Sequence, residues 1–263
     1  MPRFAANLSV LFTEQPFLDR FSAAAQAGFK GCEFAFPYLY PAEEVADKAV
    51  AAGMKIVAFN APPGDWAAGE RGLAAVPGRQ DDFRSDLELA AHYARHLGCS
   101  CVHVMAGVVP EEDWEEALDV YMANIDYAAS QLEAEGLRCL IEPISRQTVP
   151  GYFLSRPDDA ALVLEQTGHR NLYMLYDVYH AQMTQGALTD FIEGNMSRIA
   201  HIQVAGVPGR NEPDMLGEIN FRYMFDLLDG AGYDGWIGCE YKPRGTTLDG
   251  LRWASDWLRP QGV

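Results

Sequence analysis

The chain of 263 residues has little positive charge and no long apolar run. Lysine and arginine number 20 against 37 aspartates and glutamates, which gives a formal net charge of −17. This balance opposes binding to nucleic acid, because nonspecific affinity for a phosphate backbone comes from lysine and arginine. No run reaches the roughly 18 apolar residues of a membrane-spanning helix, and the N-terminus shows no signal-peptide cleavage site. We therefore expect a mature cytoplasmic protein that binds neither nucleic acid nor a membrane.

Cysteine usage disfavours a disulfide framework. The cysteines are five, an odd number, and none stands in a Cys-x-x-Cys pair, the spacing typical of redox and many zinc sites. Each lies in or beside an apolar run, so we expect reduced core residues, which suits the cytoplasm. They are Cys32, Cys99, Cys101, Cys139 and Cys239.

The sequence also lacks a P-loop and a glycine-rich dinucleotide fingerprint after its first expected strand, which disfavours an open doubly wound sheet. Short β-type runs alternate instead with longer amphipathic stretches. The expected strands span residues 4–11, 31–36, 55–60, 101–107, 138–143, 172–178, 199–206 and 236–243. The expected helices, most of which finish at a glycine suited to a helix C-terminus, include residues 17–28, 42–53, 82–98, 112–136, 157–168 and 221–232. Eight strand–helix units predict one α/β domain, residues 1–263, folded as a (β/α)8 TIM barrel with its active site at the C-terminal strand ends.

Four consecutive units each place a side-chain oxygen near the end of their strand: Glu142, Asp177, Gln203 and Glu240. Any one of them alone would be explained equally well by a loop cap or a salt bridge. Together, three buried carboxylates would repel one another strongly, and a divalent cation removes that repulsion. An all-oxygen ligand set favours Mg²⁺ or Mn²⁺.

The motifs IEP, YDVYH, HIQVAG, GEIN and GCEYKP, with the loop PPGDWAAGERGL, resemble those of the hydroxypyruvate isomerase family within the xylose isomerase-like barrels. The resemblance runs over essentially the whole chain, and 2-oxo-tetronate isomerases share these motifs. It implies that Glu142 and Glu240 are the acid/base residues and that both, with Asp177 and Gln203, bind the metal. Sugar epimerases of the wider superfamily usually have a histidine where Gln203 stands.

This resemblance implies conversion of hydroxypyruvate to 2-hydroxy-3-oxopropanoate by proton transfer through an enediolate, with a 2-oxo-tetronate or related sugar isomerase or epimerase as the alternative. A non-catalytic barrel that binds a sugar acid is an alternative of another class. Endonuclease IV-type barrels fit poorly, because they bind several zinc ions through many histidines and this chain has six.

A keto-acid or sugar-acid substrate needs partners for its carboxylate and hydroxyl groups. Arg210 and Lys242 are the leading cations, with Arg71 and Arg244 behind them, and each has an ordinary surface charge as its alternative. His180 is expected to hydrogen-bond a substrate hydroxyl or to cap its loop. Three further polar residues of the expected strands either contact ligand or pack in the core: Asn7, His103 and His201.

The segment 60–80 is long for a barrel connection and predicts a lid or binding loop. Trp66 within it would shield the metal from water or contact another subunit. The aromatic segment 34–41 would line a subunit interface or the substrate mouth, and a homo-oligomer, dimer or tetramer, is compatible with either role.

Overall fold

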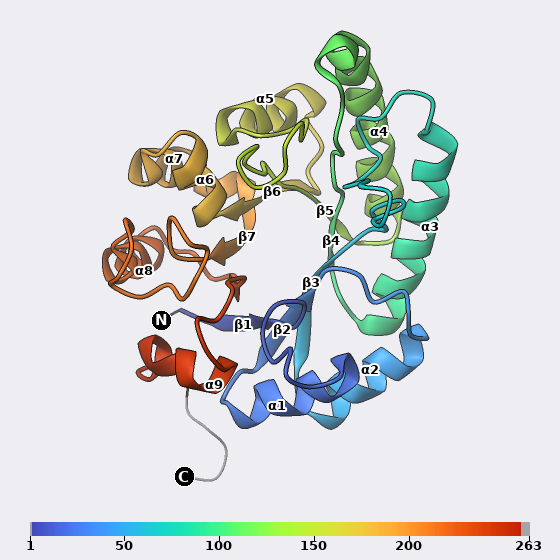
Figure 1. Ribbon diagram of the computed structural model, residues 1–263. Helices are drawn as coiled ribbons and strands as arrows, with labels where there is room; N and C mark the ends of the chain where they lie inside the picture. Colours follow the sequence, from blue (N-terminus) through green and yellow to red (C-terminus); the bar gives the residue numbers. More distant parts are fainter. Residues whose placement is uncertain (1, 259–263) are drawn as a thin grey trace.

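The computed structural model describes residues 2–258, which form a closed barrel of eight parallel strands (Figure 1). Each strand pairs with the next in sequence, and the last pairs with the first, so the sheet has no free edge. This confirms the predicted (β/α)8 TIM barrel. The strands are β1 Phe4–Asn7, β2 Gly31–Phe34, β3 Lys55–Asn60, β4 Cys101–His103, β5 Arg138–Ile141, β6 Leu172–Asp177, β7 Ile199–Val204 and β8 Ile237–Cys239.

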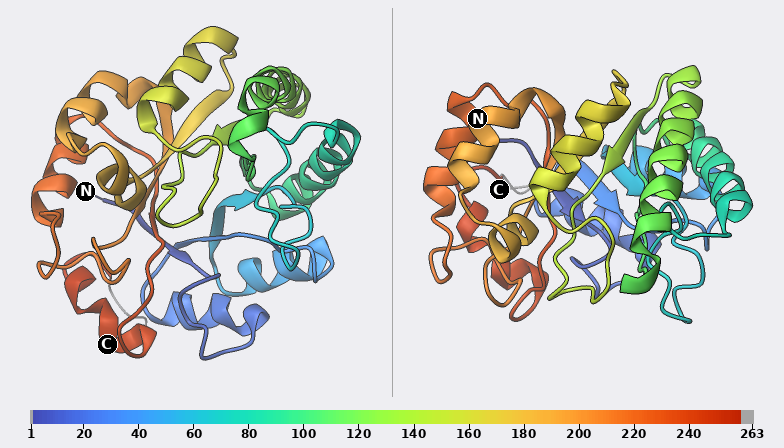
Figure 2. Two further views of the ribbon diagram at one scale, coloured as in Figure 1. Left: turned by 45° about the horizontal axis from the view of Figure 1, so that its top comes forward. Right: turned by 90° about the horizontal axis from the view of Figure 1, so that it is seen from above.

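The helices surround the barrel as an outer layer in all the views (Figures 1 and 2). They are α1 Arg20–Gln26, α2 Ala42–Ala51, α3 Gln80–Leu97, α4 Trp114–Ala134, α5 Pro157–Thr167, α6 Val178–Thr184, α7 Leu188–Asn195, α8 Phe221–Gly230 and α9 Thr247–Gly250. Four short 3-10 turns complete the order: η1 Phe17–Asp19, η2 Glu111–Asp113, η3 Met196–Arg198 and η4 Leu251–Ala254. None of the helices within residues 2–258 is both long and apolar enough to cross a bilayer.

Local sequence explains where α5 begins and ends. Pro157 is its first residue, where the missing N–H is no loss, and Asp158 and Asp159 place negative charge in its first turn. The helix stops at Thr167 because Gly168 adopts a left-handed conformation with φ of 67°, which costs glycine little. The expected helix boundary at this glycine is therefore confirmed.

The barrel interior is apolar toward one end and polar toward the other. Alternate residues of a strand face inward, and one inward set forms a small buried cluster of Ala58, Cys101, Leu140 and Leu175. Two residues further along the same strands, the inward positions become polar: Asn60, His103, Glu142 and Asp177. The remaining strands add Asn7, Glu33, Gln203 and Glu240, so every strand contributes a polar side chain at or just beyond its C-terminal end. All five cysteines are buried and free, as expected.

Several boundaries differ from expectation. The last expected strand, 236–243, is paired only over Ile237–Cys239, so Glu240 follows the strand. Helices α6 and α7 were missed between residues 178 and 195. The motif YDVYH reads as a continuing strand because it is aromatic and β-branched, but Asp177 caps a helix there: its Oδ1 accepts a hydrogen bond of 2.8 Å from the Tyr179 N–H.

Candidate active site

The four residues expected to share a site border one interior space. Asp177 ends β6, and Gln203 is its register partner on β7. Glu142 and Glu240 directly follow β5 and β8. Three of the four, Glu142, Gln203 and Glu240, line a cavity of about 20 Å³, and a carboxylate oxygen of Asp177 lies within 4.8 Å of one on Glu142. Neighbouring parallel strands therefore bring side chains far apart in sequence into one cluster.

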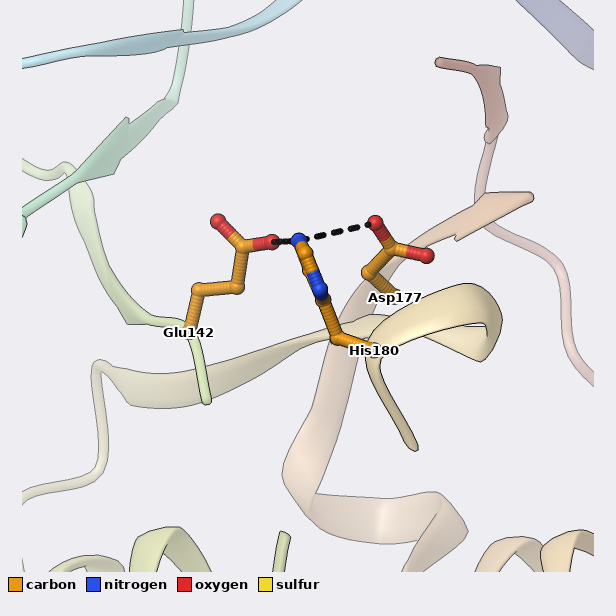
Figure 3. A group of neighbouring side chains, drawn as sticks. All are labelled: Glu142, Asp177 and His180. Carbon is orange, nitrogen blue, oxygen red and sulfur yellow. Dashed lines mark ion pairs between the residues drawn. The ribbon is translucent and has the colours of Figure 1, made fainter. Parts of the chain in front are cut away.

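His180 lies between two of these carboxylates (Figure 3). Its Nε2 is 3.6 Å from Asp177 Oδ2 and 3.9 Å from Glu142 Oε1. Within residues 2–258, Glu142, Asp177 and His180 form the one group of three acidic, histidine or cysteine side chains close enough to hold a metal ion. The structure thus offers a buried site of the right composition for a divalent cation.

Burial dominates the electrostatics of this cluster. It raises the pKa of Glu142 well above the ordinary value, and the charges of Glu240 and Asp177 raise this pKa further. It also raises the pKa of Asp177, against the opposing effect of Arg210. The pKa of Glu240 rises to about 7 for the same reason, although Arg210 again opposes the change. The raised pKa values of these three neighbouring acids indicate that a positive charge beside them would stabilise their ionised forms.

Burial favours the neutral form of His180 and His103. Burial lowers the pKa of His180 well below its ordinary value and that of His103 to about 3. The Ser145 backbone N–H donates to His180 Nδ1 at 3.4 Å, so the proton of the neutral ring belongs on Nε2, which faces the two carboxylates. In this tautomer Nε2 is a hydrogen-bond donor. His103, one of the residues with two open roles, lies beside the site, with its Nδ1 3.5 Å from Glu142 Oε2.

Arg210 sits in the cluster in a left-handed backbone conformation with φ of 53°. Its Nη2 is 2.8 Å from Glu240 Oε2 and 3.3 Å from Asp177 Oδ2. Burial alone lowers the pKa of Arg210, but the surrounding carboxylates outweigh it and raise the pKa above its ordinary value. The guanidinium therefore stays charged and already pairs with two carboxylates of the site.

Glu33 on β2 is a polar residue of the site that the sequence analysis missed. Its side chain is 2% exposed and accepts hydrogen bonds at Oε1 from Asn7 Nδ2 at 2.9 Å and from Gln203 Nε2 at 2.7 Å. Its Oε2 contacts His201 Nε2. Gly238 on β8 makes room, because a Cβ there would lie 2.4 Å from the Glu33 carboxylate oxygens. A glutamate inside the apolar run GCEFAF was the signal that could have revealed it.

The network around Glu33 fixes the Gln203 amide. Glu33 Oε1 accepts a hydrogen bond from the Gln203 NH₂ group, so the amide oxygen of Gln203 points away from Glu33. Gln203 Oε1 is accordingly buried and has no hydrogen-bond partner among residues 2–258. A buried acceptor without a donor is costly, and a cation beside Glu142 and Glu240 would satisfy it. Asn7 and His201, whose roles were open, both contact Glu33, the residue that orients Gln203.

A larger cavity of about 510 Å³ opens above the cluster. Glu142, His180, Arg210 and Glu240 line it, together with residues from the segments that follow β1, β2 and β3: Ser9, Phe17, Arg20, Phe36, Trp66 and Arg71. The expected binding loop 60–80 thus reaches this cavity, and Trp66, 47% exposed, forms part of its wall.

Other residues expected at the site lie elsewhere. The side chain of Lys242 is exposed and does not line the cavity, although its backbone N–H donates to the Arg210 carbonyl at 2.7 Å. Its expected substrate contact stays a prediction. Arg244 pairs with Asp214 at 2.6 Å and with Glu212 at 3.1 Å. Of the aromatic segment 34–41, Phe36 lines the cavity while Leu39 is 90% exposed.

Comparison with known proteins identifies the family of this chain. The family described as "Xylose isomerase-like TIM barrel" matches residues 21–261. A 2-oxo-tetronate isomerase of Cupriavidus necator is 48% identical over 98% of this chain and 99% of its own length. The hydroxypyruvate isomerase of Escherichia coli is 43% identical over 96% of this chain and 98% of its own length.

The chain belongs to the hydroxypyruvate isomerase and 2-oxo-tetronate isomerase family of xylose isomerase-like TIM barrels. It is accordingly an isomerase of the aldose–ketose type that acts on a small molecule. The crystal structure described as AP endonuclease, family 2, from Brucella melitensis superposes with a TM-score of 0.96 at 44% identity, over 98% of this chain and 100% of that one. The family membership that the motifs suggested is therefore confirmed.

Proposed function

We propose that this isomerase interconverts the keto and aldehyde forms of a short 2-oxo acid, hydroxypyruvate first and 2-oxo-tetronate as the alternative. The observation that carries the proposal is a pair of carboxylates, the buried Glu142 and the partly buried Glu240, that line the same small cavity beside the buried oxygen of Gln203, which has no hydrogen-bond partner within residues 2–258. Aldose–ketose isomerisation needs two groups that exchange protons with adjacent carbons and positive charge beside the oxygens between them.

For hydroxypyruvate, one glutamate removes a proton from the hydroxymethyl carbon, and the electron pair forms the C=C bond of an enediolate. The other glutamate returns a proton to the former carbonyl carbon, while the hydroxyl proton moves to the neighbouring oxygen. The product is 2-hydroxy-3-oxopropanoate, with no atom gained or lost. The raised pKa values of Glu142 and Glu240 support this role, because a group that both takes and gives protons works best near neutrality.

The residues present fit a divalent cation. Glu142, Asp177, Gln203 and Glu240 would hold Mg²⁺ or Mn²⁺, since all four offer oxygen and Gln203 Oε1 has no other partner within the described residues. The cavity of about 20 Å³ exceeds the roughly 10–15 Å³ that one water-sized occupant needs. When bound, such a cation supplies positive charge that stabilises the developing oxyanion.

His180 belongs to substrate binding in this proposal. Its Nε2–H points into the cluster, which suits donation to a substrate hydroxyl or carbonyl oxygen better than metal ligation. Arg210, paired to Asp177 and Glu240, also borders the cavity and contributes positive charge to it. The net charge of −17 weighs against DNA as an alternative substrate.

The test is a substrate panel. Hydroxypyruvate and 2-oxo-tetronate are each incubated with the protein in deuterated solvent, with Mg²⁺, with Mn²⁺ and with EDTA, and followed by proton NMR. We expect metal-dependent product formation and loss of the signal of the exchanged C–H in at least one acid. Binding of these acids without exchange or product in either metal would instead support a non-catalytic sugar-acid-binding barrel.

A further inference from the structure

The cations around the larger cavity differ in what already neutralises them. Arg210 is paired with two carboxylates. Arg20 donates from Nε to the Gln15 carbonyl at 2.9 Å and from Nη1 to the Leu8 carbonyl at 2.7 Å, and Glu14 adds a negative charge beside it. Arg71 is the third cation of this cavity, and its contacts differ from those of Arg210 and Arg20.

Arg71 has no carboxylate partner within residues 2–258, in a chain whose acidic residues outnumber its basic ones by nearly two to one. Its hydrogen bonds all run from Nη1 to carbonyls of its own loop, Trp66 at 3.0 Å and Glu70 at 2.7 Å. The guanidinium carbon stacks over the Trp66 ring at 3.7 Å. Nε and Nη2 therefore remain available on a guanidinium that is already oriented.

The loop that carries this pair is anchored at both ends. Glu70 contacts Arg79 and accepts from the Asp65 N–H at 2.5 Å, which ties the loop across its base. Gly72 forms a bridge with Ala106, and its φ of 110° and the Met105 backbone 2.3 Å from a would-be Cβ leave no room for another residue. Trp66 packs in turn against Phe36, with ring centroids 5.2 Å apart. Arg71 and Trp66 thus form a preorganised part of the wall of the cavity that Glu142 and Glu240 also line.

We propose that Arg71, stacked on Trp66, binds the carboxylate of the substrate and is the residue that makes the site select acids over neutral sugars. The inference rests on the proposed function, which requires a substrate with a carboxylate beside the reacting carbonyl. Glu142, Asp177 and Glu240 lie where the substrate reacts, and their negative charge would repel the carboxylate of an acidic substrate. That carboxylate therefore needs to lie beside a cation that no other carboxylate neutralises. Arg71 offers the planar fork that matches a carboxylate in two hydrogen bonds.

The kinetic test compares charged and neutral substrates. Arg71→Met removes the charge and keeps a stem able to pack on Trp66, and Arg71→Lys keeps the charge without the fork. We expect Arg71→Met to raise KM for the 2-oxo acid about 10- to 100-fold, the size of a lost charge-assisted hydrogen bond, with a smaller change in kcat. Dihydroxyacetone, in which CH₂OH replaces the carboxylate of hydroxypyruvate, serves as the neutral substrate and should be affected less than about twofold. Arg71→Lys should fall between wild type and Arg71→Met.

The matched control is Arg84→Met. Arg84 also stacks on an aromatic ring, that of Tyr127 at 5.0 Å, but on the outer helix α3, away from the cavity. Its replacement should leave KM for every substrate unchanged. Arg20→Met tests the competing cation of the cavity. A larger rise in KM for the acid with Arg20→Met than with Arg71→Met would overturn the assignment, as would equal effects of Arg71→Met on acid and neutral substrates.

A binding measurement separates this inference from the proposed reaction. D-glycerate and its neutral analogue glycerol are titrated calorimetrically into the Mn²⁺-loaded protein, whether or not any acid is turned over. We expect wild type to prefer glycerate and Arg71→Met to lose that preference about 10- to 100-fold. If no 2-oxo acid is isomerised but this preference depends on Arg71, the proposed function fails and the carboxylate site stands. If wild type binds glycerate no better than glycerol, or Arg71→Met binds it equally well, the carboxylate site is refuted.

Discussion

The two halves of the barrel contribute different chemistry to one cavity. The strands β5 to β8 supply the buried Glu142, Asp177 and Gln203 and the partly buried Glu240, which lie close enough to perturb one another. The loops after β1, β2 and β3 supply aromatic rings and a cation held by stacking, such as Phe36, Trp66 and Arg71. The comparison suggests that one half carries out proton transfer and the other selects and holds the substrate. Substitutions in the second half, strands β5 to β8, should therefore act on kcat, and those in the first half, the loops after β1 to β3, mainly on KM.

The largest effect is expected from removing either proton-transfer group. Glu142→Gln and Glu240→Gln keep the shape of the side chain but cannot exchange a proton, so each should lower kcat by roughly 10²- to 10⁴-fold. KM should change much less, the reverse of the pattern for Arg71→Met. Turnover and solvent-deuterium incorporation, followed by NMR, measure the loss.

Thermal melting must show that both variants stay folded, which we expect because the amide removes charge repulsion from a buried site. Glu165→Gln is the control: this glutamate pairs with Arg198 on the outer surface, at 3.7 Å, and should leave turnover unchanged. A near-normal kcat in either site variant would show that this glutamate does not transfer a proton. It would also contradict the assignment of proton transfer to the second half of the barrel.

The sequence predicted the second half of the barrel better than the first. Glu142, Asp177 and Glu240 could be found because each ends an apolar strand, and a parallel barrel brings all strand ends to one rim. Glu33 could have been noticed as a charged residue inside an apolar strand, but its partners could not be predicted, and neither could the lack of a carboxylate partner for Arg71 within the described residues. Both depend on contacts across the barrel or within an irregular loop, between residues whose spacing follows no strand or helix period. Helix α6 was missed for a local reason, because its first residues, Val178 and Tyr179, are typical of a strand and the Asp177 cap marks the place where the helix begins.

Glu33 connects the two halves of the barrel, because it lies on β2 in the first half but contacts Gln203 and His201 on β7. We expect it to act as a positioning residue that keeps Gln203 Oε1 turned toward the metal ligands. In Glu33→Gln the new amide can donate as well as accept, so the Gln203 amide is free to turn over. Affinity for Mn²⁺, measured by calorimetry, should fall about 10-fold, at the lower end of the range for residues that orient metal ligands.

A charge swap tests whether orientation is the cause. In the double variant Glu33→Gln with Gln203→Glu, the new glutamate accepts from the new amide and presents its other oxygen to the site, with the total charge unchanged. Part of the Mn²⁺ affinity should return. Equal affinity in wild type and Glu33→Gln, or no recovery in the swap with both proteins folded, would reduce Glu33 to a packing residue and leave the two halves independent.

The smallest expected effect is a pH dependence of stability that arises from the site carboxylates of the second half. An ordinary glutamate in the unfolded chain titrates near 4.5, whereas burial raises the pKa of Glu240 to about 7 in the fold. Between these values the folded protein holds more protons than the unfolded one, so the free energy of unfolding of the metal-free protein falls as pH rises through this window. Glu142 and Asp177, whose pKa values are also raised, act in the same direction.

Melting temperatures in EDTA between pH 4.5 and 7.5 isolate this contribution as the difference between wild type and Glu240→Gln. We expect the variant to become more stable relative to wild type as pH rises, by on the order of a few degrees. Mn²⁺ should stabilise wild type more at pH 7.5 than at pH 5, because a cation binds the deprotonated carboxylates. Arg71→Met should leave this pH dependence unchanged, since no carboxylate pairs with Arg71 within the described residues. A constant difference between wild type and Glu240→Gln across the window would show that Glu240 titrates normally, and the two halves would then differ in position but not in electrostatics.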